Sequence, residues 1–349
     1  MTTSLQALLG TELPIIQAPM AGSQGSALAI AVGRAGGLGS LPSAMLAADA
    51  IRAEVAAIRA GIDGKPFNLN FFAHQPVAAD PAREAQWRQA LGPYYAEYGI
   101  DPAGIAAGPG RNPFTREAAA LVLELRPAVV SFQFGLPPID LLDMVRAAGA
   151  RVLGAATTLE EGQWLEANGV DAVVAQGLEA GGHRGHFLSD DLSRQLGTIA
   201  LVRQLVRALR IPVVAAGGIA DAAGVAAAVA LGAAGVQVGT AYLSCPEATT
   251  SKVHRAALAS EAARHTAVTR LFSGRPARGI VNRLMRELGP LSTVAPAFPM
   301  AGGALAPLRA RAEAAGNGDF SPLWAGQNAY GCRAVPAADL TRELARGLG

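Results

Sequence analysis

The sequence predicts an α/β fold, a (β/α)8 TIM barrel, and three observations support this prediction. Short apolar runs alternate with longer Ala-rich segments along most of the 349 residues. The apolar runs lack polar alternation, which indicates parallel strands that are buried on both faces. Eight such strand–helix units fit into about 240 residues, close to the usual size of this barrel.

The eight expected strands lie at residues 13–18, 38–41, 66–72, 128–132, 151–155, 171–175, 211–215 and 235–238. Helices are expected at 26–35, at 47–60, from Pro138, from Thr158, at 193–209 and at 222–231. Thr158 and Glu161 have the spacing of a capping box, and Asp221 is placed to cap the last helix. An open doubly wound sheet is the alternative, but the glycines at 36–39 lack the G-x-G-x-x-G spacing of its usual fingerprint.

Two segments fall outside the repeat. Residues 73–126 are too long for a simple loop and contain a helical stretch from Trp87 to Tyr98. Residues 246–349 follow the last strand and are rich in Arg, Gly and Pro. We therefore divide the chain into a barrel, residues 1–245 with the insertion 73–126, and a C-terminal extension that caps the barrel and contributes to the substrate pocket. Excursions of this length are often lids or binding loops, although decoration of the barrel ends is equally compatible with the residues.

Composition and charge exclude several classes of function. The chain is 51% hydrophobic and 16% charged with a net charge of +2, and no basic cluster is long enough to track nucleic-acid phosphates. Cys245 and Cys332 are too few for a disulfide framework or a zinc site, which is typical of reduced thiols in a cytoplasmic protein. Neither a signal peptide nor a membrane span is expected. We expect a cytoplasmic monomer or homodimer without a metal.

Two glycine turns predict a phosphate site. In a barrel, the residues that follow the strands gather on one face. Gly217-Gly218 follows the seventh strand and Gly239-Thr240 the eighth, which are the usual positions of a phosphate cradle in this fold. Glycine lets backbone N–H groups approach the phosphate, and each turn precedes a helix N-terminus, which favours an anion. Because no acidic cluster for Mg²⁺ accompanies the turns, we expect a permanently held cofactor rather than a nucleoside triphosphate.

Other strand ends carry amide side chains and a histidine. Asn70 and Gln176 can donate and accept hydrogen bonds, which suits the pyrimidine edge of an isoalloxazine ring, although buried loop backbone could also use them. The most specific local signal is the loop from Gln176 to His186, in which Gly181-Gly182 directly precedes His183. Imidazole can take up a proton near neutral pH or hold an anion when protonated, so we place His183 at the reactive centre. His186 is interpreted as supporting or exposed.

Eight segments carry a resemblance to a known family, in order and with compatible spacing from about residue 12 to 330. They are PIIQAPMAG (14–22), AGGLGS (35–40), FNLNFF (67–72), VVAQGLEAGGHRG (173–185), PVVAAGGIAD (212–221), GVQVGTAYLSCPE (235–247), FSGRPARGIVNR (272–283) and WAGQ (324–327). The chain resembles the bacterial nitronate monooxygenases, and EAGGHRG with FSGRPARG and WAGQ resembles the group that oxidises propionate 3-nitronate. EAGGH alone is shared with flavin-dependent enoyl-acyl-carrier-protein reductases and related NADH:quinone reductases.

The resemblance implies non-covalent FMN and the oxidation of alkyl nitronates, among them propionate 3-nitronate, by O2 to carbonyl compounds and nitrite. It makes His183 the catalytic residue. Together with the glycine turns, it gives an expected FMN-binding set of Met20, Ala21, Gly22, Asn70, Gln176, Gly181, Gly182, Gly217, Gly218, Gln237, Val238, Gly239 and Thr240. Relatives tend to carry tyrosines in the substrate pocket, whereas this chain has Phe298 and no Tyr in residues 108–112. Hydroxyls that would hold a carboxylated substrate are therefore missing.

Several alternatives stay open at this point. A flavin reductase that uses NADH or NADPH, of the enoyl-acyl-carrier-protein or quinone reductase type, shares the EAGGH motif, and a flavin-binding protein without catalysis is a third possibility. His183 could act as a base or as an electrostatic anchor, and we favour the anchor because a nitronate is already deprotonated. Arg275 and Arg278 would assist if the loop that contains them folds back over the barrel face.

Overall fold

The fold is a closed barrel of eight parallel strands in a computed structural model that describes residues 4–78, 80–105 and 112–349. The strands are β1 (Ile15–Gln17), β2 (Gly39–Pro42), β3 (Phe67–Phe72), β4 (Val129–Gln133), β5 (Arg151–Ala156), β6 (Ala172–Gln176), β8 (Val213–Ala216) and β9 (Gly235–Val238). They pair in the order β2-β3-β4-β5-β6-β8-β9-β1, and a parallel bridge between Ile16 and Leu38 joins β1 to the chain just before β2. The predicted barrel is confirmed, and every expected strand overlaps an observed one.

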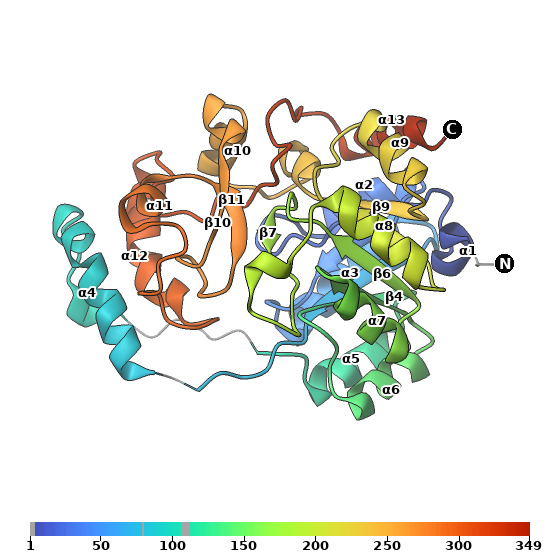
Figure 1. Ribbon diagram of the computed structural model, residues 1–349, viewed down its shortest axis with the longest axis horizontal. Helices are drawn as coiled ribbons and strands as arrows, with labels where there is room; N and C mark the ends of the chain where they lie inside the picture. Colours follow the sequence, from blue (N-terminus) through green and yellow to red (C-terminus); the bar gives the residue numbers. More distant parts are fainter. Residues whose placement is uncertain (1–3, 79, 106–111) are drawn as a thin grey trace.

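Helices surround the barrel on the outside (Figure 1). They are α2 (Ser26–Arg34), α3 (Ala48–Gly61), α5 (Arg116–Leu125), α6 (Ile139–Ala147), α7 (Leu159–Ala167), α8 (Thr198–Ala208) and α9 (Ala222–Ala230). The short helix α1 (Leu5–Leu9) packs Leu5 and Leu9 against the apolar interior of the barrel. Near the C-terminus, α13 (Ala337–Ala345) and the 3-10 turn η5 (Arg346–Leu348) return to the barrel and contact α9. None of the helices within the described ranges is long and apolar enough to cross a membrane.

One expected helix start and one expected capping box differ from the structure. The helix expected from residue 193 begins at Thr198, because the Glu179 carboxylate accepts hydrogen bonds from the Thr198 N–H at 2.8 and 3.0 Å. Residues 192–194 form a separate 3-10 turn, η2 (Leu192–Arg194). Thr158 caps α7 as expected, but the Glu161 carboxylate accepts from the backbone of Thr157 and Phe187, both at 2.7 Å, instead of closing a capping box.

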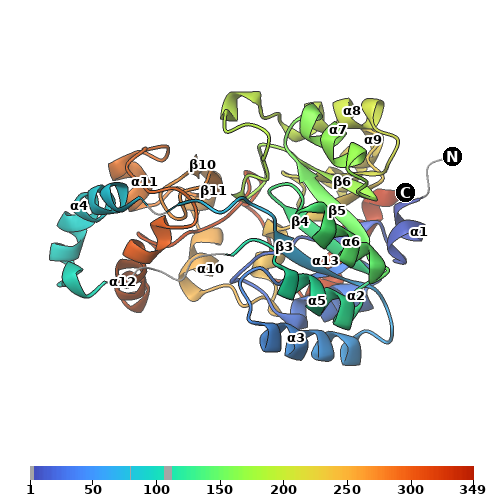
Figure 2. The same ribbon diagram turned by 90° about the horizontal axis from the view of Figure 1, so that it is seen from below.

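A second lobe lies beside the barrel and is built from both segments outside the repeat (Figures 1 and 2). The insertion contributes α4 (Pro81–Glu97) and the turn η1 (Pro102–Gly104). The extension contributes α10 (Lys252–Leu258), η4 (Glu261–Arg264), α11 (Arg283–Leu288) and α12 (Ala301–Ala314). Trp87 and Tyr95 of α4 donate to the carbonyls of Ala301 and Ala304, at 3.0 and 2.7 Å, so the insertion helix packs on the extension rather than on the barrel wall. The last helix of the inserted stretch, α5, is one of the barrel helices and packs on α6.

A small antiparallel sheet joins the two lobes. Its strands are β7 (Gly182–His183), β10 (Thr266–Thr269) and β11 (Ala277–Ile280), in the order β10-β11-β7. Residues Ala277 and Arg278 of the extension pair with His183 and Gly182 of the loop after β6. The extension therefore holds the backbone of His183 in place.

Candidate active site

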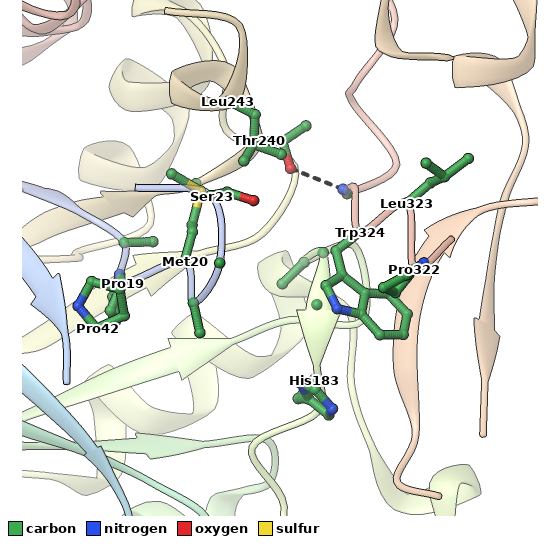
Figure 3. Close-up of a pocket in the computed structure, with 18 of the residues that line it drawn as sticks. Pro19, Met20, Ser23, Pro42, His183, Thr240, Leu243, Pro322, Leu323 and Trp324 are labelled. Carbon is green, nitrogen blue, oxygen red and sulfur yellow. Dashed lines mark hydrogen bonds between the residues drawn. The ribbon is translucent and has the colours of Figure 1, made fainter. Parts of the chain in front are cut away.

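One large cavity opens at the carboxyl ends of the barrel strands, between the barrel and the second lobe (Figure 3). All the residues predicted for the site line this cavity except Val238, whose side chain is buried in the core. Residues of the extension complete the wall, among them His254, Leu323, Trp324 and Asn328. The face that the sequence predicted as reactive is thus a single concave site.

The two glycine turns lie side by side in this wall. Gly217 and Gly218 have φ angles of 120° and 73°, in the left-handed region that favours glycine. A Cβ on Gly217 would lie 3.0 Å from the Ala180 nitrogen, so the turn is also closely packed.

Helix α9 begins soon after this turn, and the Asp221 side chain caps it by accepting from the Gly224 N–H at 2.8 Å. Gly239 and Thr240 lead into the 3-10 turn η3 (Thr240–Ser244). Both turns precede a helical N-terminus, as expected. At the N-terminus of α9, however, the Asp221 carboxylate already accepts one of the free N–H groups.

The amide side chains are held by neighbouring polar groups. Asn70 donates to the hydroxyl and the carbonyl of Ser131, at 2.9 and 3.1 Å. Gln176 donates to the His183 carbonyl at 2.9 Å and accepts from the Gly185 N–H at 2.7 Å. A carboxamide has two N–H donors, so one N–H of Gln176 remains for a ligand. Because these amide side chains are already held in one orientation, a ligand that bonds to them does not bear the entropic cost of ordering them.

His183 is positioned through both its backbone and its ring. Its carbonyl accepts hydrogen bonds from Gln176 and, at 3.1 Å, from Gln133. Its Nε2 lies 2.8 Å from the Ser273 hydroxyl, which also donates to the Arg275 carbonyl at 3.2 Å. Because a carbonyl can only accept, the hydroxyl hydrogen is directed to Arg275 and the oxygen is left to accept from a protonated Nε2. The arrangement suits an imidazole that carries a proton on Nε2.

The two arginines of the FSGRPARG loop do not line the cavity. Arg278 donates to the carbonyls of Leu178 and Thr266, at 2.8 and 3.2 Å, and so fixes the loop. The Arg275 guanidinium lies 4.1 Å from the Phe134 ring centroid and donates to the His186 carbonyl. Burial lowers the pKa of Arg275 to about 10, so it stays charged at neutral pH behind the aromatic ring. The loop that contains both arginines folds back against the His183 loop, but neither guanidinium lines the cavity.

The other histidines are divided between core and surface. His186 is buried rather than exposed, and burial together with Arg275 lowers its pKa to about 4, which keeps the ring neutral near pH 7. His254 is also buried, and its Nε2 lies 3.0 Å from the Trp324 carbonyl. His74 packs edge-on against Phe298, with ring centroids 4.9 Å apart. His265 is exposed.

A family model described as nitronate monooxygenase matches residues 2–347. The chain belongs to the nitronate monooxygenase family. This confirms the resemblance read from the sequence motifs and, with it, the expectation of an oxidoreductase enzyme.

Individual relatives agree over nearly the whole length. The chain is 47% identical to a nitronate monooxygenase of Paraburkholderia phytofirmans, over 99% of this chain and 94% of the relative. It is 46% identical to a nitronate monooxygenase of Pseudomonas aeruginosa, over 100% of this chain and 99% of the relative. Among solved structures, a nitroalkane oxidase from Streptomyces ansochromogenes superposes with a TM-score of 0.88 at 40% identity, covering 99% of this chain and 98% of that one.

In this member of the nitronate monooxygenase family, an aromatic wall surrounds His183. The ring centroids of Phe134, Phe298 and Trp324 lie 6.0, 5.7 and 5.5 Å from that of His183. Phe72 extends the wall and packs on Phe134 at 5.1 Å. The resemblance placed only Phe298 near the substrate. We did not predict the rest of this wall from the sequence, because its members are spread over more than 200 residues and the others resemble ordinary core residues. Ser273 was missed for the same reason, although the FSGRPARG motif contains it.

Two charged side chains also line the cavity. Arg309 and Glu313 form an ion pair at 2.7 Å, and Glu313 also accepts from the Ser321 hydroxyl at 2.7 Å. Both residues belong to α12 of the second lobe. Within the described ranges, no group of three or more His, Cys, Asp or Glu side chains is arranged to hold a metal ion. Beside His183, the cavity is lined by the rings of Phe72 and Trp324 and by uncharged amides, whereas Phe134 and Phe298 pack against the His183 ring without lining the cavity.

Proposed function

We propose that this chain is an FMN-dependent monooxygenase that oxidises alkyl nitronates with O2 to carbonyl compounds and nitrite. The observation that carries the proposal is that one cavity brings together two glycine turns, the amides of Asn70 and Gln176, and His183. The names of the relatives, two nitronate monooxygenases and a nitroalkane oxidase, support the same substrate class.

The residues of the cavity fit FMN. The turns at Gly217-Gly218 and Gly239-Thr240 form a cradle for one phosphate, and the close packing around Gly217 leaves no room there for a side chain. Asn70 of β3 and Gln176 of β6 both line the cavity, where they could contact the polar edge of the isoalloxazine ring. A single phosphate cradle without a dinucleotide fingerprint favours FMN over FAD.

The protein side chains would bind and orient the nitronate. When bound, FMN supplies the one-electron redox chemistry between the nitronate and O2. A nitronate arrives without its α-proton, so no residue has to remove one. A protonated His183 would hold the negative oxygens of the nitronate, and Ser273 would keep the ring oriented. Phe134, Phe298 and Trp324 exclude water, and the lower local polarity strengthens the attraction between imidazolium and nitronate.

The sequence motifs favour propionate 3-nitronate within this class, and we propose it as the specific substrate. Its carboxylate would meet the aromatic wall, because Arg275 lies behind Phe134 and Arg309 is already paired with Glu313. Residues 108–111 of the GPGRN stretch, which also lacks Tyr, lie outside the described residues. We therefore expect propionate 3-nitronate to be oxidised with a higher KM than an alkyl nitronate of similar length that has no carboxylate.

Restoring a hydroxyl at the wall should change this preference. In Phe298→Tyr, the new O–H extends a ring that packs against His183, and we expect it to reach the cavity and donate to the substrate carboxylate. A hydrogen bond to a charged group should then lower KM for propionate 3-nitronate by about tenfold. The KM for butyl-1-nitronate should stay nearly unchanged, because it has no group to accept the bond. Steady-state kinetics on both substrates measure the ratio. An equal change for the two nitronates would mean that Phe298 does not face the substrate tail.

The proposed function is tested by the reductant that bleaches the bound flavin. The purified protein should be yellow and should release FMN, not FAD, on denaturation. Without oxygen, an alkyl nitronate should bleach the flavin rapidly while NADH and NADPH have little effect. Rapid bleaching by NADH or NADPH would support the flavin reductase instead, and a flavin that neither donor reduces would point to a binding protein without catalysis. A colourless protein that cannot be reconstituted with FMN would overturn the proposal.

A further inference from the structure

We propose that residues 325–328 of the extension, called the strap below, are part of the cofactor site and hold its phosphate-binding turns in place. FMN would then leave the cavity only when the strap lifts. This inference rests on the proposed function, because it requires FMN in the cavity. It assigns to the extension a role in retaining the cofactor, in addition to any contact with the substrate.

The strap ties together three loops of the barrel. The Gly326 N–H donates to the Thr240 hydroxyl at 2.9 Å, the bond drawn as a dashed line in Figure 3. The Gln327 N–H donates to the Glu179 carbonyl at 2.9 Å, and the Asn328 side chain donates to the Gly218 carbonyl at 2.9 Å. The three acceptors follow β9, β6 and β8. One short segment from outside the barrel thus sets the spacing between the loops that form the predicted phosphate cradle.

The bond to Thr240 directs its hydroxyl towards a ligand. Because the Thr240 oxygen accepts from the Gly326 N–H, the hydroxyl keeps its own hydrogen for another acceptor. Thr240 lines the cavity, and the phosphate oxygens of FMN are acceptors without hydrogen. Hydrogen bonds from a hydroxyl to an ionised oxygen are about twice as strong as those between neutral groups. The strap therefore prepares Thr240 as a phosphate donor.

The bond from Asn328 orients the neighbouring peptide group. In a trans peptide, the carbonyl and the following N–H point in opposite directions. Holding the Gly218 carbonyl towards Asn328 turns the N–H of Ile219 away from Asn328, and Ile219 lines the cavity. Asn328 would act as a positioning residue, because it fixes the turn without needing to touch the cofactor.

Backbone contact between the strap and the EAGGH loop leaves no room for side chains. A Cβ on Gly326 would lie 2.8 Å from the Glu179 carbonyl oxygen, and a Cβ on Gly181 would lie 2.5 Å from the Gly326 nitrogen. Contacts this short do not occur, so a methyl group at position 326 must move the strap away from the barrel. Two glycines at this point allow the strap to seal the cavity directly beside the loop that carries His183.

The test compares three variants that differ only in the strap. Gly326→Ala should displace the strap and release FMN at least about tenfold faster than the wild type, because the bonds to Thr240 and Glu179 are lost together. Asn328→Ala, which removes one bond from an exposed side chain, should release FMN about threefold faster. Gln327→Ala is the matched control, since its backbone N–H makes the bond and its side chain is exposed; its release rate should equal that of the wild type. FMN that passes an ultrafiltration membrane after dilution of the holoprotein measures the rate, and circular dichroism checks the fold.

The outcomes separate the strap from the proposed function. If the wild type retains FMN and all three variants release it at the wild-type rate, the strap has no role and the proposed function stands. If the wild type does not bind FMN, the proposed function fails and the inference fails with it. Should Gly326→Ala not fold, the comparison of Asn328→Ala with Gln327→Ala decides, since both are changes of exposed side chains; equal rates for that pair would overturn the inference.

Discussion

Replacing Gly218 by Asp should leave a folded protein that can barely retain FMN. The residue stands in the turn after β8 and lines the cavity, so an Asp carboxylate would lie beside the proposed phosphate. Two unit negative charges about 4 Å apart repel each other by on the order of 4 kcal/mol at the effective dielectric constant near a protein surface. That corresponds to a loss of FMN affinity of about a thousandfold. Titration of the apoprotein with FMN, followed by the flavin absorbance of the bound fraction, measures the dissociation constant.

Gly218→Asn is the control that separates charge from shape. Asn and Asp have nearly the same volume, and both tolerate the left-handed conformation that Gly218 adopts at φ 73° better than other residues do. A Cβ at this position would lie 3.4 Å from the Glu179 Cβ, an ordinary contact. We expect Gly218→Asn to weaken FMN binding far less than Gly218→Asp. Equal effects of the two variants would mean that no phosphate lies beside this turn.

The fold could be predicted from the sequence because its signal is local. A strand such as the one ending at Gln176 is a short apolar run, and two adjacent glycines predict the turn at Gly217-Gly218. Both features are fixed by a few neighbouring residues, and the barrel topology then brings the strand ends to one face. The expected site residues could be named for the same reason: each lies in the C-terminal half of a strand or in the loop that follows it.

What the sequence could not predict depends on contacts between distant segments. Ser273 meets His183 across 90 positions of the chain, and its own neighbours do not mark it as a partner. Glu179 reads as a loop residue, yet its carboxylate sets the start of α8 at Thr198. The helix α4 carries Trp87 and Tyr95, which suggested only a lid or a decoration, and the structure packs both on α12. Such pairings follow from packing in three dimensions and have no periodic signature along the chain.

Replacing His183 by Asn should reduce the rate of flavin reduction by a nitronate by about 10²-fold or more, the range for a positioned acid–base or electrostatic group. Asn retains some hydrogen bonding but cannot carry a positive charge. The FMN content should be nearly unchanged, because the cradle consists of other residues. Anaerobic stopped-flow absorbance measures the rate. His186→Asn is the control three residues away: its ring is buried and does not line the cavity, so the variant should reduce stability more than rate.

The pH dependence of the same rate distinguishes the two roles of His183. An imidazolium that anchors the nitronate loses activity as the pH rises and the ring gives up its proton, whereas a general base gains activity over the same interval. We expect the first profile, because the substrate is already an anion and because the Ser273 hydroxyl accepts from a protonated Nε2. Ser273→Ala removes that acceptor, so it should shift the falling limb to lower pH while leaving the limiting rate at low pH close to that of the wild type. A rate that rises with pH in the wild type would make His183 a base, and a Ser273→Ala profile identical to that of the wild type would remove Ser273 from the mechanism.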